Sequence, residues 1–511
     1  MDILVSAAIS ELISRSAAFL INKCWRRQPG DEKNLQRLSQ LLLRAHAIVE
    51  EAEGRRITNQ AMLLQLKMLA EAFYRGLFVL DTFRIQALPG SKGDELKEEE
   101  EQEVSQEEQE VSPSAAPGKR ARSSDGDVST VRFGVSSRSA TELQEMADYL
   151  KNLIADTREF VVFLGSYPRL RRQPYCTYLL LDSCMFGRQM ERERVLSFLL
   201  QPDATAGAEN LAVLPIVGPI RVGKSTLVEN VSRDEMVRDR FSLILLFRES
   251  SITDGGLTDL TKSGVVKHEN SHVSYRRLLI VIELAEDIDE ETWGKMIDSA
   301  NRIAGATRII ITSRSSKIVR LGTTGALWLY HLPPEAYWHF FKTLAFGSSN
   351  PDEHPALASM AMEIATEQRQ CFVSGYIVAE LLRENLDARF WRAVLRCVRA
   401  YKQKHLLLFE EHPSNLLRVD EPVYYWRLGR GGGGSYFLIR DYYQTESGRE
   451  EAGEVITVRE VLLGGDTPRG RFEALGWRSR LPPYYNYVIS CVMQEPERVV
   501  SRCRRKRRIH D

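Results

Sequence analysis

The stretch LAVLPIVGPIRVGKSTLVENV, residues 211–231, decides the fold of the central part of this chain. An apolar run of strand length ends at Gly218. The next residues fit the pattern G-x-x-x-x-G-K-[ST], and a helical pattern follows. Glycines let such a loop curl until its backbone N–H groups point at phosphate oxygens, and the helix that follows adds a favourable dipole. The stretch predicts a strand–loop–helix unit that binds nucleotide phosphates.

The residue types in the loop predict a role for each position. The Lys224 side chain is expected to reach the β- and γ-phosphates, and the Ser225 hydroxyl to coordinate Mg²⁺. The expected nucleotide contacts of the loop are Gly218, Val222, Gly223, Lys224, Ser225 and Thr226. The expected cofactors are ADP or ATP together with Mg²⁺.

Hydrolysis requires acidic residues at the end of a second strand, one for Mg²⁺ and often one to orient water. The candidate is RRLLIVIELAED, in which Glu283 ends an apolar run and Leu284 follows it. Glu283 is therefore the candidate magnesium-linked acid. Glu286 and Asp287 lie further on, and we favour an acidic loop before a helix for these two residues over a catalytic role.

From about residue 186, strand candidates alternate with helical stretches. The apolar runs are residues 211–217, 241–247, 278–284, 308–312 and 326–331. Strands that are apolar throughout are typical of a parallel sheet with helices on both faces. The sequence thus predicts a central P-loop α/β domain with a parallel sheet.

The N-terminal part carries helical periodicity, which predicts a bundle. The expected helices cover residues 5–24, 35–52, 66–80 and 143–164. The Glu-, Gln- and Ser-rich segment between the third and fourth helices has almost no large apolar residues. We expect it to be disordered, with a solvated single helix across its Glu run as the alternative.

The C-terminal part predicts helices first and strands afterwards. Helical periodicity covers residues 333–404. Four segments rich in β-branched and aromatic residues follow, at 422–428, 435–443, 454–463 and 485–493. Short runs of this kind, separated by Gly and Pro, predict an antiparallel β domain. We expect this domain to bind a partner protein, with a packing cap for the preceding helices as the alternative.

The predicted architecture is therefore multidomain. Its expected parts are three helices of a coiled-coil-type bundle (1–88), a disordered acidic insert (89–139), a fourth helix and linker (140–185), the P-loop nucleotide-binding domain (186–332), a helical subdomain (333–414), a β-rich domain (415–495) and a basic tail (496–511).

Composition limits the classes of function. The 69 Lys and Arg residues balance 69 Asp and Glu residues, so no general affinity for nucleic acid or anionic membranes is expected. Seven scattered cysteines predict reduced thiols, and no apolar run is long enough to span a membrane. We expect a cytoplasmic protein, with the basic run RCRRKRR as a candidate nuclear import signal.

The chain resembles a plant NLR-type disease resistance protein of the grass kind, with a coiled-coil N-terminal domain and an NB-ARC nucleotide-binding module. The resemblance rests on CMFGRQMERERV, GPIRVGKST, GATRIIITSRSSKIV, ALWLYHLPPEAYWHFFKTLAFG and, in the N-terminal part, YRGLFVLDTFRIQ. It covers about residues 1–400. It implies adenine contacts from Phe186, Gly187 and Arg188, and a terminal-phosphate sensor at Arg314. It also implies protein partners: NLR relatives, pathogen effectors or host signalling proteins, with oligomer formation.

The sequence departs from the family pattern at several functional points. Pro219 and Arg221 replace loop glycines, and Pro219 lacks a backbone N–H donor. Glu283 and Leu284 stand where the family has two aspartates. Neither an M-H-D motif nor a leucine-rich repeat is visible.

The expected function is therefore a nucleotide-binding switch or adaptor of plant defence, acting through protein contacts with weak or no hydrolysis. Two alternatives stay open: an active P-loop ATPase that uses Glu283, and a nuclear, nucleic-acid-associated protein. The second is disfavoured because no helix-turn-helix or zinc spacing supports base reading.

Overall fold

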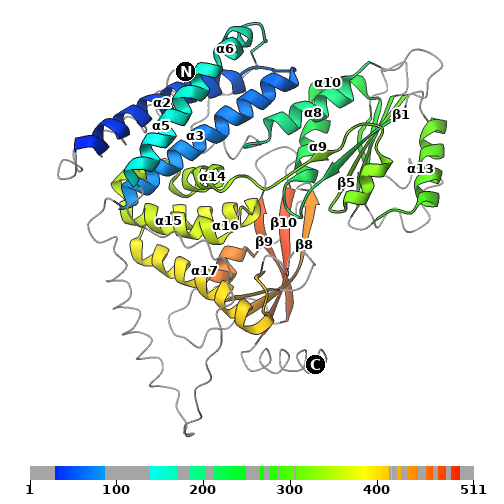
Figure 1. Cartoon of the computed structure of the whole chain (residues 1–511). Coiled ribbons are helices and arrows are strands. Elements are labelled where there is room, and N and C mark those ends of the chain that lie inside the picture. The colour runs from blue at the N-terminus through cyan, green and yellow to red at the C-terminus, as the bar shows by residue number, and fades with distance from the viewer. Residues whose placement is uncertain are drawn as a thin grey trace, which may run out of the picture.

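The structure is a computed structural model of the whole chain (Figure 1). It describes residues 29–86, 139–169, 185–202, 211–248, 265–269, 277–284, 287–303, 306–413, 416, 423–426, 436–446, 456–463, 470–478 and 485–494. The first expected helix, the acidic insert and the basic tail lie outside these ranges. None of the helices within them has the length and apolar character needed to cross a membrane.

The N-terminal part is helical, as predicted. It consists of α2 (Pro29–Glu53), α3 (Gln60–Gln86), α5 (Ser139–Asp156) and the short α6 (Arg158–Leu164). The fourth expected helix is thus divided into two. The helices of the N-terminal part share one apolar core. Helices α2, α3 and α5 pack closely there because Gly76 of α3 carries no side chain. A Cβ atom at Gly76 would lie 2.7 Å from Leu42 Cδ2 and 3.1 Å from Leu150 Cδ1.

The central domain contains the predicted parallel sheet. Its strands are β1 (Leu211–Val217), β2 (Leu243–Arg248), β3 (Val265–Glu269), β4 (Arg277–Glu283), β5 (Ala306–Ser313) and β6 (Leu327–Trp328). They follow the order β3-β2-β4-β5-β1-β6, and only β3 runs antiparallel to its neighbour. The five predicted strands are all present. The edge strand β3 was not predicted, because VVKHE is short and half polar.

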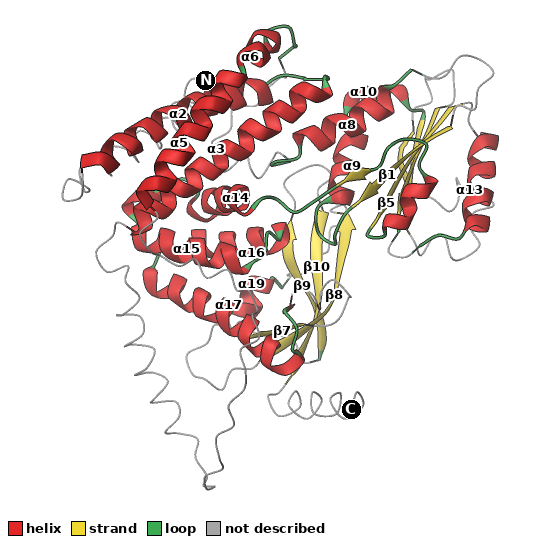
Figure 2. Cartoon of the chain, viewed as in Figure 1, coloured by secondary structure: helices red, strands yellow, loops and turns green. Residues whose placement is uncertain are grey.

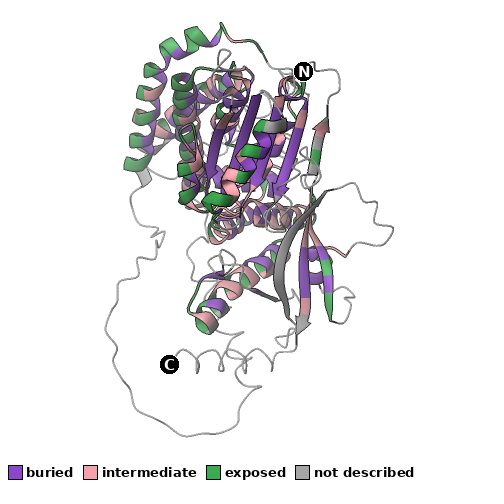
Figure 3. Ribbon diagram, turned by 90° about the vertical axis from the view of Figure 1, so that its right-hand side faces the viewer, coloured by how far each residue is buried: buried purple, intermediate pink, exposed green. Residues whose placement is uncertain are grey.

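Helices cover the two faces of this sheet. One apolar layer joins the strands to α8 (Gln189–Leu200), α9 (Lys224–Ser232) and α10 (Glu235–Arg240), and the other joins them to α13 (Glu290–Ile303) and the 3-10 turn at Ser316–Leu321. Strands β1, β4 and β5 are buried along most of their length, as their apolar sequences require (Figure 3). This arrangement places the carboxyl ends of β1, β4 and β5 at one edge, where α/β proteins bind ligands.

A helical unit follows the sheet and packs below the N-terminal bundle (Figure 2). It contains α14 (Pro334–Phe346), α15 (Pro355–Glu367), α16 (Phe372–Arg383) and α17 (Ala388–Phe409) around a core rich in aromatic side chains. Helix α14 also touches α3, so this unit connects the bundle with the rest of the chain.

The C-terminal part is an antiparallel sheet, as predicted. Its strands β7 (Val423–Trp426), β8 (Tyr436–Glu446), β9 (Arg471–Arg478) and β10 (Tyr485–Gln494) follow the order β7-β8-β10-β9. Two details differ from the prediction. The expected strand at 454–463 contains a helix, α19 (Val458–Leu462), and β9 was missed. A capping box explains the helix, because the Thr457 side chain and Glu460 satisfy each other's backbone N–H groups.

Candidate functional site

The loop between β1 and α9 depends on two of its glycines in different ways. At Gly218, a Cβ atom would lie 2.6 Å from the Leu329 carbonyl oxygen, so no larger residue fits. Gly223 has φ +94°, a left-handed conformation that glycine adopts without strain. A Cβ atom there would meet no atom within 4 Å, so the space in front of the loop is open. The helix α9 begins directly after Gly223, with Ser225 and Thr226 in its first turn.

The Lys224 ammonium group is held by the loop itself. Its Nζ donates to the carbonyl oxygens of Gly218 at 2.7 Å and Pro219 at 2.8 Å. Burial, together with the positive charge of Arg314, lowers the pKa of Lys224 to about 8, while Glu283 acts in the opposite direction. Because burial and the charge of Arg314 both disfavour the protonated form of Lys224, a bound anion such as a phosphate group would stabilise that form.

Arg221 carries backbone strain in the same loop. It has φ +60°, in the left-handed region where the family pattern has a glycine. For a residue with a Cβ atom this conformation costs about 1–2 kcal/mol. The loop therefore keeps the backbone shape of a glycine-rich loop although the glycine is absent.

This strain leads to a testable difference between two substitutions. We expect Arg221→Gly to be more stable than Arg221→Ala by about 1 kcal/mol, because only glycine relieves the left-handed conformation. Thermal unfolding of the two variants measures the difference. The same pair of substitutions at exposed Lys295, inside α13, provides the control. There the order reverses, since glycine costs about 1 kcal/mol relative to alanine inside a helix. Equal stabilities at position 221 would contradict the assigned backbone conformation.

The acidic side of the site is sparse. Glu283 ends β4 beside Thr312 of β5, close enough to Lys224 to raise its pKa. The Leu284 side chain is buried in the apolar layer between the sheet and α13, and its N–H donates to the Thr312 carbonyl oxygen at 2.9 Å. Asp287 lies on the surface and pairs with Lys317 at 2.7 Å, which fits the predicted acidic loop before a helix. Among the residues that the structure describes, Glu283 is the acid at this edge whose charge acts on Lys224.

The residues expected to contact adenine lie between the loop and the helical unit. The buried Arg188 guanidinium donates to the carbonyl oxygens of Val222 at 3.2 Å and Tyr330 at 2.6 Å, so it braces the loop. Gly187 has φ +66°, and a Cβ atom there would lie 2.7 Å from a Leu332 methyl group. The structure thus bonds Arg188 directly to the loop and places Gly187 against Leu332, just before α14.

The Phe186 ring lies in an aromatic cluster that joins the bundle to the helical unit. Its centroid is 5.4 Å from Tyr74 of α3, and 6.1 Å and 5.7 Å from His339 and Phe340 of α14. Burial lowers the pKa of His339 to about 3, so this imidazole is neutral at physiological pH. The segment with Phe186, Gly187 and Arg188 is therefore packed against the N-terminal bundle through Phe186.

A buried carboxylate fixes the same boundary. Asp81 of α3 accepts a hydrogen bond from Trp338 Nε1 at 2.8 Å and forms an ion pair with Lys342, both on α14. Burial alone would raise the pKa of Asp81, but the charges of Lys342 and Arg84 outweigh it and keep the pKa below its usual value. A second ion pair joins Arg84 to Asp352. Asp81 lies in YRGLFVLDTFRIQ, which resembles the family's acidic region. The contact itself could not be predicted because its partners are distant in sequence.

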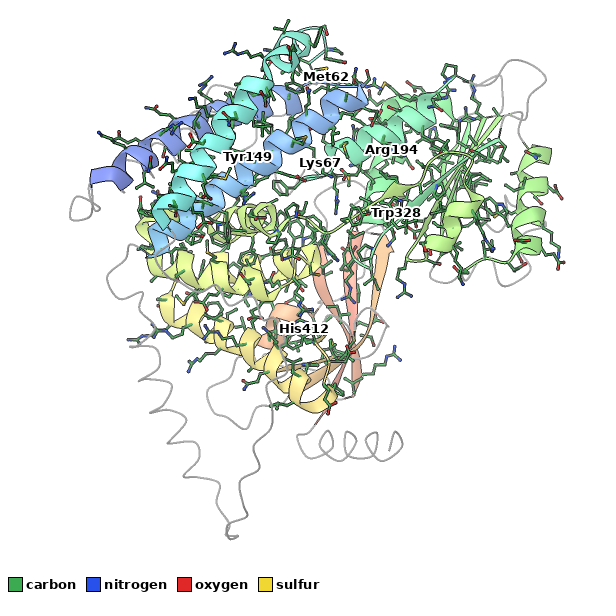
Figure 4. The ribbon with its side chains drawn as sticks, viewed as in Figure 1. Met62, Lys67, Tyr149, Arg194, Trp328 and His412 are labelled. Carbon is green, nitrogen blue, oxygen red and sulfur yellow. The ribbon has the colours of Figure 1, made fainter. Side chains whose placement is uncertain are left out.

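A second bundle contact reaches the central domain. Lys67 of α3, labelled in Figure 4, pairs with Glu191 of α8, with 3.5 Å between Nζ and Oε1. Glu191 is buried, and it also lies 3.8 Å from Arg188. Arg188, which braces the loop through Val222, is thus linked to α3 of the bundle through Glu191.

The loop residues fit a nucleotide with its magnesium ion. Lys224, the first turn of α9 and the open space at Gly223 suit phosphate oxygens. The Ser225 hydroxyl and Glu283 are oxygen donors for Mg²⁺, whose shell is normally completed by phosphates and water. The described residues hold no group of three or more acidic, His or Cys side chains that could bind a metal without a nucleotide.

Comparisons with known proteins support the resemblance. The Rx N-terminal domain model matches residues 8–116. The disease resistance protein RGA2 of Solanum bulbocastanum is 21% identical over 381 residues, which are 71% of this chain and 36% of that protein. The RPP13-like protein 1 of Arabidopsis thaliana, named as a candidate disease resistance protein, is 23% identical over 83% of this chain and 40% of its own length.

The chain is homologous to plant disease resistance proteins. The homology extends over most of its length, and the matched family model covers its N-terminal part. The chain spans less than half of the length of these curated relatives.

Proposed function

We propose that this homologue of plant disease resistance proteins is a nucleotide-binding defence protein that holds ADP or ATP at residues 218–226. It acts as a switch or adaptor through contacts with other proteins. The observation that carries the proposal is the state of Lys224, which is half-buried, close enough to Arg314 for that charge to lower its pKa, and satisfied by carbonyl oxygens of its own loop. The homology supports the role in plant defence.

Each part of the site has a role in this proposal. The bound nucleotide supplies anionic phosphates and, with Mg²⁺, a charge that the protein can sense. Lys224 and the first-turn N–H groups of α9 bind the phosphates, with Arg314 adding positive charge. Ser225 and Glu283 would hold the metal ion. Arg188 keeps the loop in place through the Val222 carbonyl oxygen.

The direct test is to identify the nucleotide that the purified protein carries. The full chain is denatured after gel filtration, and the released nucleotide is separated by ion-exchange chromatography. We expect ADP or ATP at a ratio near one per chain, and none from an Arg314→Ala, Lys224→Ala double variant. Absence of nucleotide, combined with no binding of added ADP or ATP, would overturn the proposal.

Hydrolysis by this site should be slow. The second acidic position is occupied by Leu284, which is buried in the core. Loss of one aligned group that acts on the transition state can cost on the order of 10²–10³ in rate. We therefore expect phosphate release well below about 1 per second, measured with saturating ATP and Mg²⁺, with Lys224→Ala as the background. A turnover of roughly 1–10³ per second, typical of efficient enzymes, would support the ATPase alternative instead.

A further inference from the structure

The C-terminal sheet reaches the phosphate loop. Figure 1 shows β8, β9 and β10 running upward to the region of α9, and the turned view of Figure 3 shows the sheet below the central domain. Tyr487 lies on β10, and its side chain forms a hydrogen bond with that of Thr226 in the first turn of α9. The charges of Arg221 and Glu283 both act on the Tyr487 hydroxyl. This tyrosine therefore contacts the first turn of α9 and lies within electrostatic range of the loop and the end of β4.

A β-bulge between β9 and β10 affects the orientation of the Tyr487 side chain. The pairing of β10 with β9 shifts between Tyr487 and Val488, so that Gly476 is the extra residue on β9. Such bulges re-aim side chains and are frequent next to functional sites. Gly476 is tightly packed, because a Cβ atom there would lie 3.0 Å from Ile489 Cδ1 and 3.3 Å from the Tyr487 carbonyl oxygen.

A row of aromatic rings holds Tyr487 in position. Trp477 is its partner across the strands, with ring centroids 5.5 Å apart. Trp477 stacks on Tyr376 of α16 at 4.5 Å, and Tyr376 meets Phe340 of α14 edge-on at 5.1 Å. Phe340 touches Phe186, which lies two residues before the loop-bracing Arg188. The row runs from Phe186, in the expected adenine segment, to Tyr487 beside the loop. Its members on α14 and α16 therefore hold the Tyr487 ring in place.

We propose that Tyr487 is a binding residue of the nucleotide site, contributed by the C-terminal sheet, and that its hydroxyl donates a hydrogen bond to a phosphate oxygen of the bound nucleotide. The inference rests on the proposed nucleotide binding and assigns the C-terminal sheet a part in it. Docking of the sheet and occupancy of the loop then stabilise each other, because coupling between two binding events is reciprocal.

The chemistry of the hydroxyl suits this role. Burial raises the pKa of Tyr487 to about 12, so the group is a neutral donor at physiological pH and does not repel phosphate. Thr226 keeps the hydroxyl directed at the loop when no phosphate is bound. The hydroxyl also lies in the fields of two opposite charges, that of Arg221 and that of Glu283, the residue proposed to hold Mg²⁺.

The first test is the affinity of the full chain for a fluorescent ADP analogue. We expect Tyr487→Phe to weaken binding about ten- to hundredfold, the range for one hydrogen bond to a charged group. Tyr149→Phe, an exposed tyrosine of α5 labelled in Figure 4, should bind like the wild type. Unchanged affinity in Tyr487→Phe, with binding lost in Lys224→Ala, would overturn the role of Tyr487 and leave the proposed function intact. Wild-type affinity in Lys224→Ala would overturn the proposed function.

The second test needs no nucleotide. Hydrogen–deuterium exchange of the ligand-free protein should rise in β10 near residue 487 in both Tyr487→Phe and Thr226→Val. The double variant should show no further rise, because both single changes remove the same hydrogen bond. Adding ADP to the wild-type protein should slow exchange in the same segment. Unchanged exchange in the single variants, or no response of β10 to ADP, would show that the sheet does not take part in the site.

Discussion

Lys224→Ala should abolish saturable nucleotide binding, leaving a Kd above about 1 mM. The ammonium group is the cation that the loop carbonyl oxygens of Gly218 and Pro219 hold at the proposed phosphate position. Alanine removes both the charge and its hydrogen bonds. Isothermal titration with ADP and with ATP measures the loss. Lys317→Ala is the matched control, because this lysine is exposed in the same domain and pairs with Asp287. Binding of wild-type strength in Lys224→Ala would contradict the assignment.

The same lysine gives the binding a pH dependence. Its pKa of about 8 in the ligand-free protein means that the cation predominates at pH 7 and is about tenfold depleted at pH 9. Phosphate binds the cation, so affinity should fall about tenfold between these two values. Arg314→Gln should shift the fall to higher pH, since Arg314 is one of the causes of the lowered pKa. Affinity that stays constant across this range would count against Lys224 as the phosphate ligand.

Asp81→Ala should destabilise the contact between the bundle and the helical unit by about 3–5 kcal/mol. The substitution leaves Lys342 without its buried carboxylate and Trp338 Nε1 without its acceptor. The change is measured as a fall in the first thermal transition of the full chain, together with faster amide exchange in α3 and α14.

Two further variants separate charge burial from simple loss of a side chain. Glu291→Ala removes an exposed ion pair with Lys295 on α13 and should change stability by no more than about 1 kcal/mol. Combining Asp81→Leu with Lys342→Met removes both charges and should recover much of the loss. A small effect of Asp81→Ala, comparable to that of Glu291→Ala, would show that this carboxylate does not hold the boundary.

Local patterns in the sequence were enough to predict the fold class. The apolar runs at 211–217 and 278–284 and the helical period of the N-terminal part became β1, β4 and the bundle helices. The errors occurred where a local signal was weak or contradicted. VVKHE is too polar for a buried strand, and the capping box at Thr457 converts a β-branched segment into a helix.

The candidate site was only partly predictable, for a similar reason. The loop is contiguous, so its residues could be named from their spelling, and their roles in binding remain predictions. Tyr487 and Asp81 reach their partners through tertiary packing, across the sheet bulge and the bundle boundary. One tyrosine among the 18 in this chain carries no sequence signal that marks it as close to Thr226.

The burial of Leu284 limits how this site could change during evolution. Its side chain lies with Ile288 and Met296 in the apolar layer between the sheet and α13. A single substitution to aspartate would place a carboxylate among these apolar groups, and burial without a partner costs several kcal/mol. The variant would lose stability before it gained catalysis. An ancestor or descendant with an efficient hydrolytic site would need compensating changes in the core at the same time. Mutational drift therefore preserves a binding pocket here more easily than it produces an enzyme.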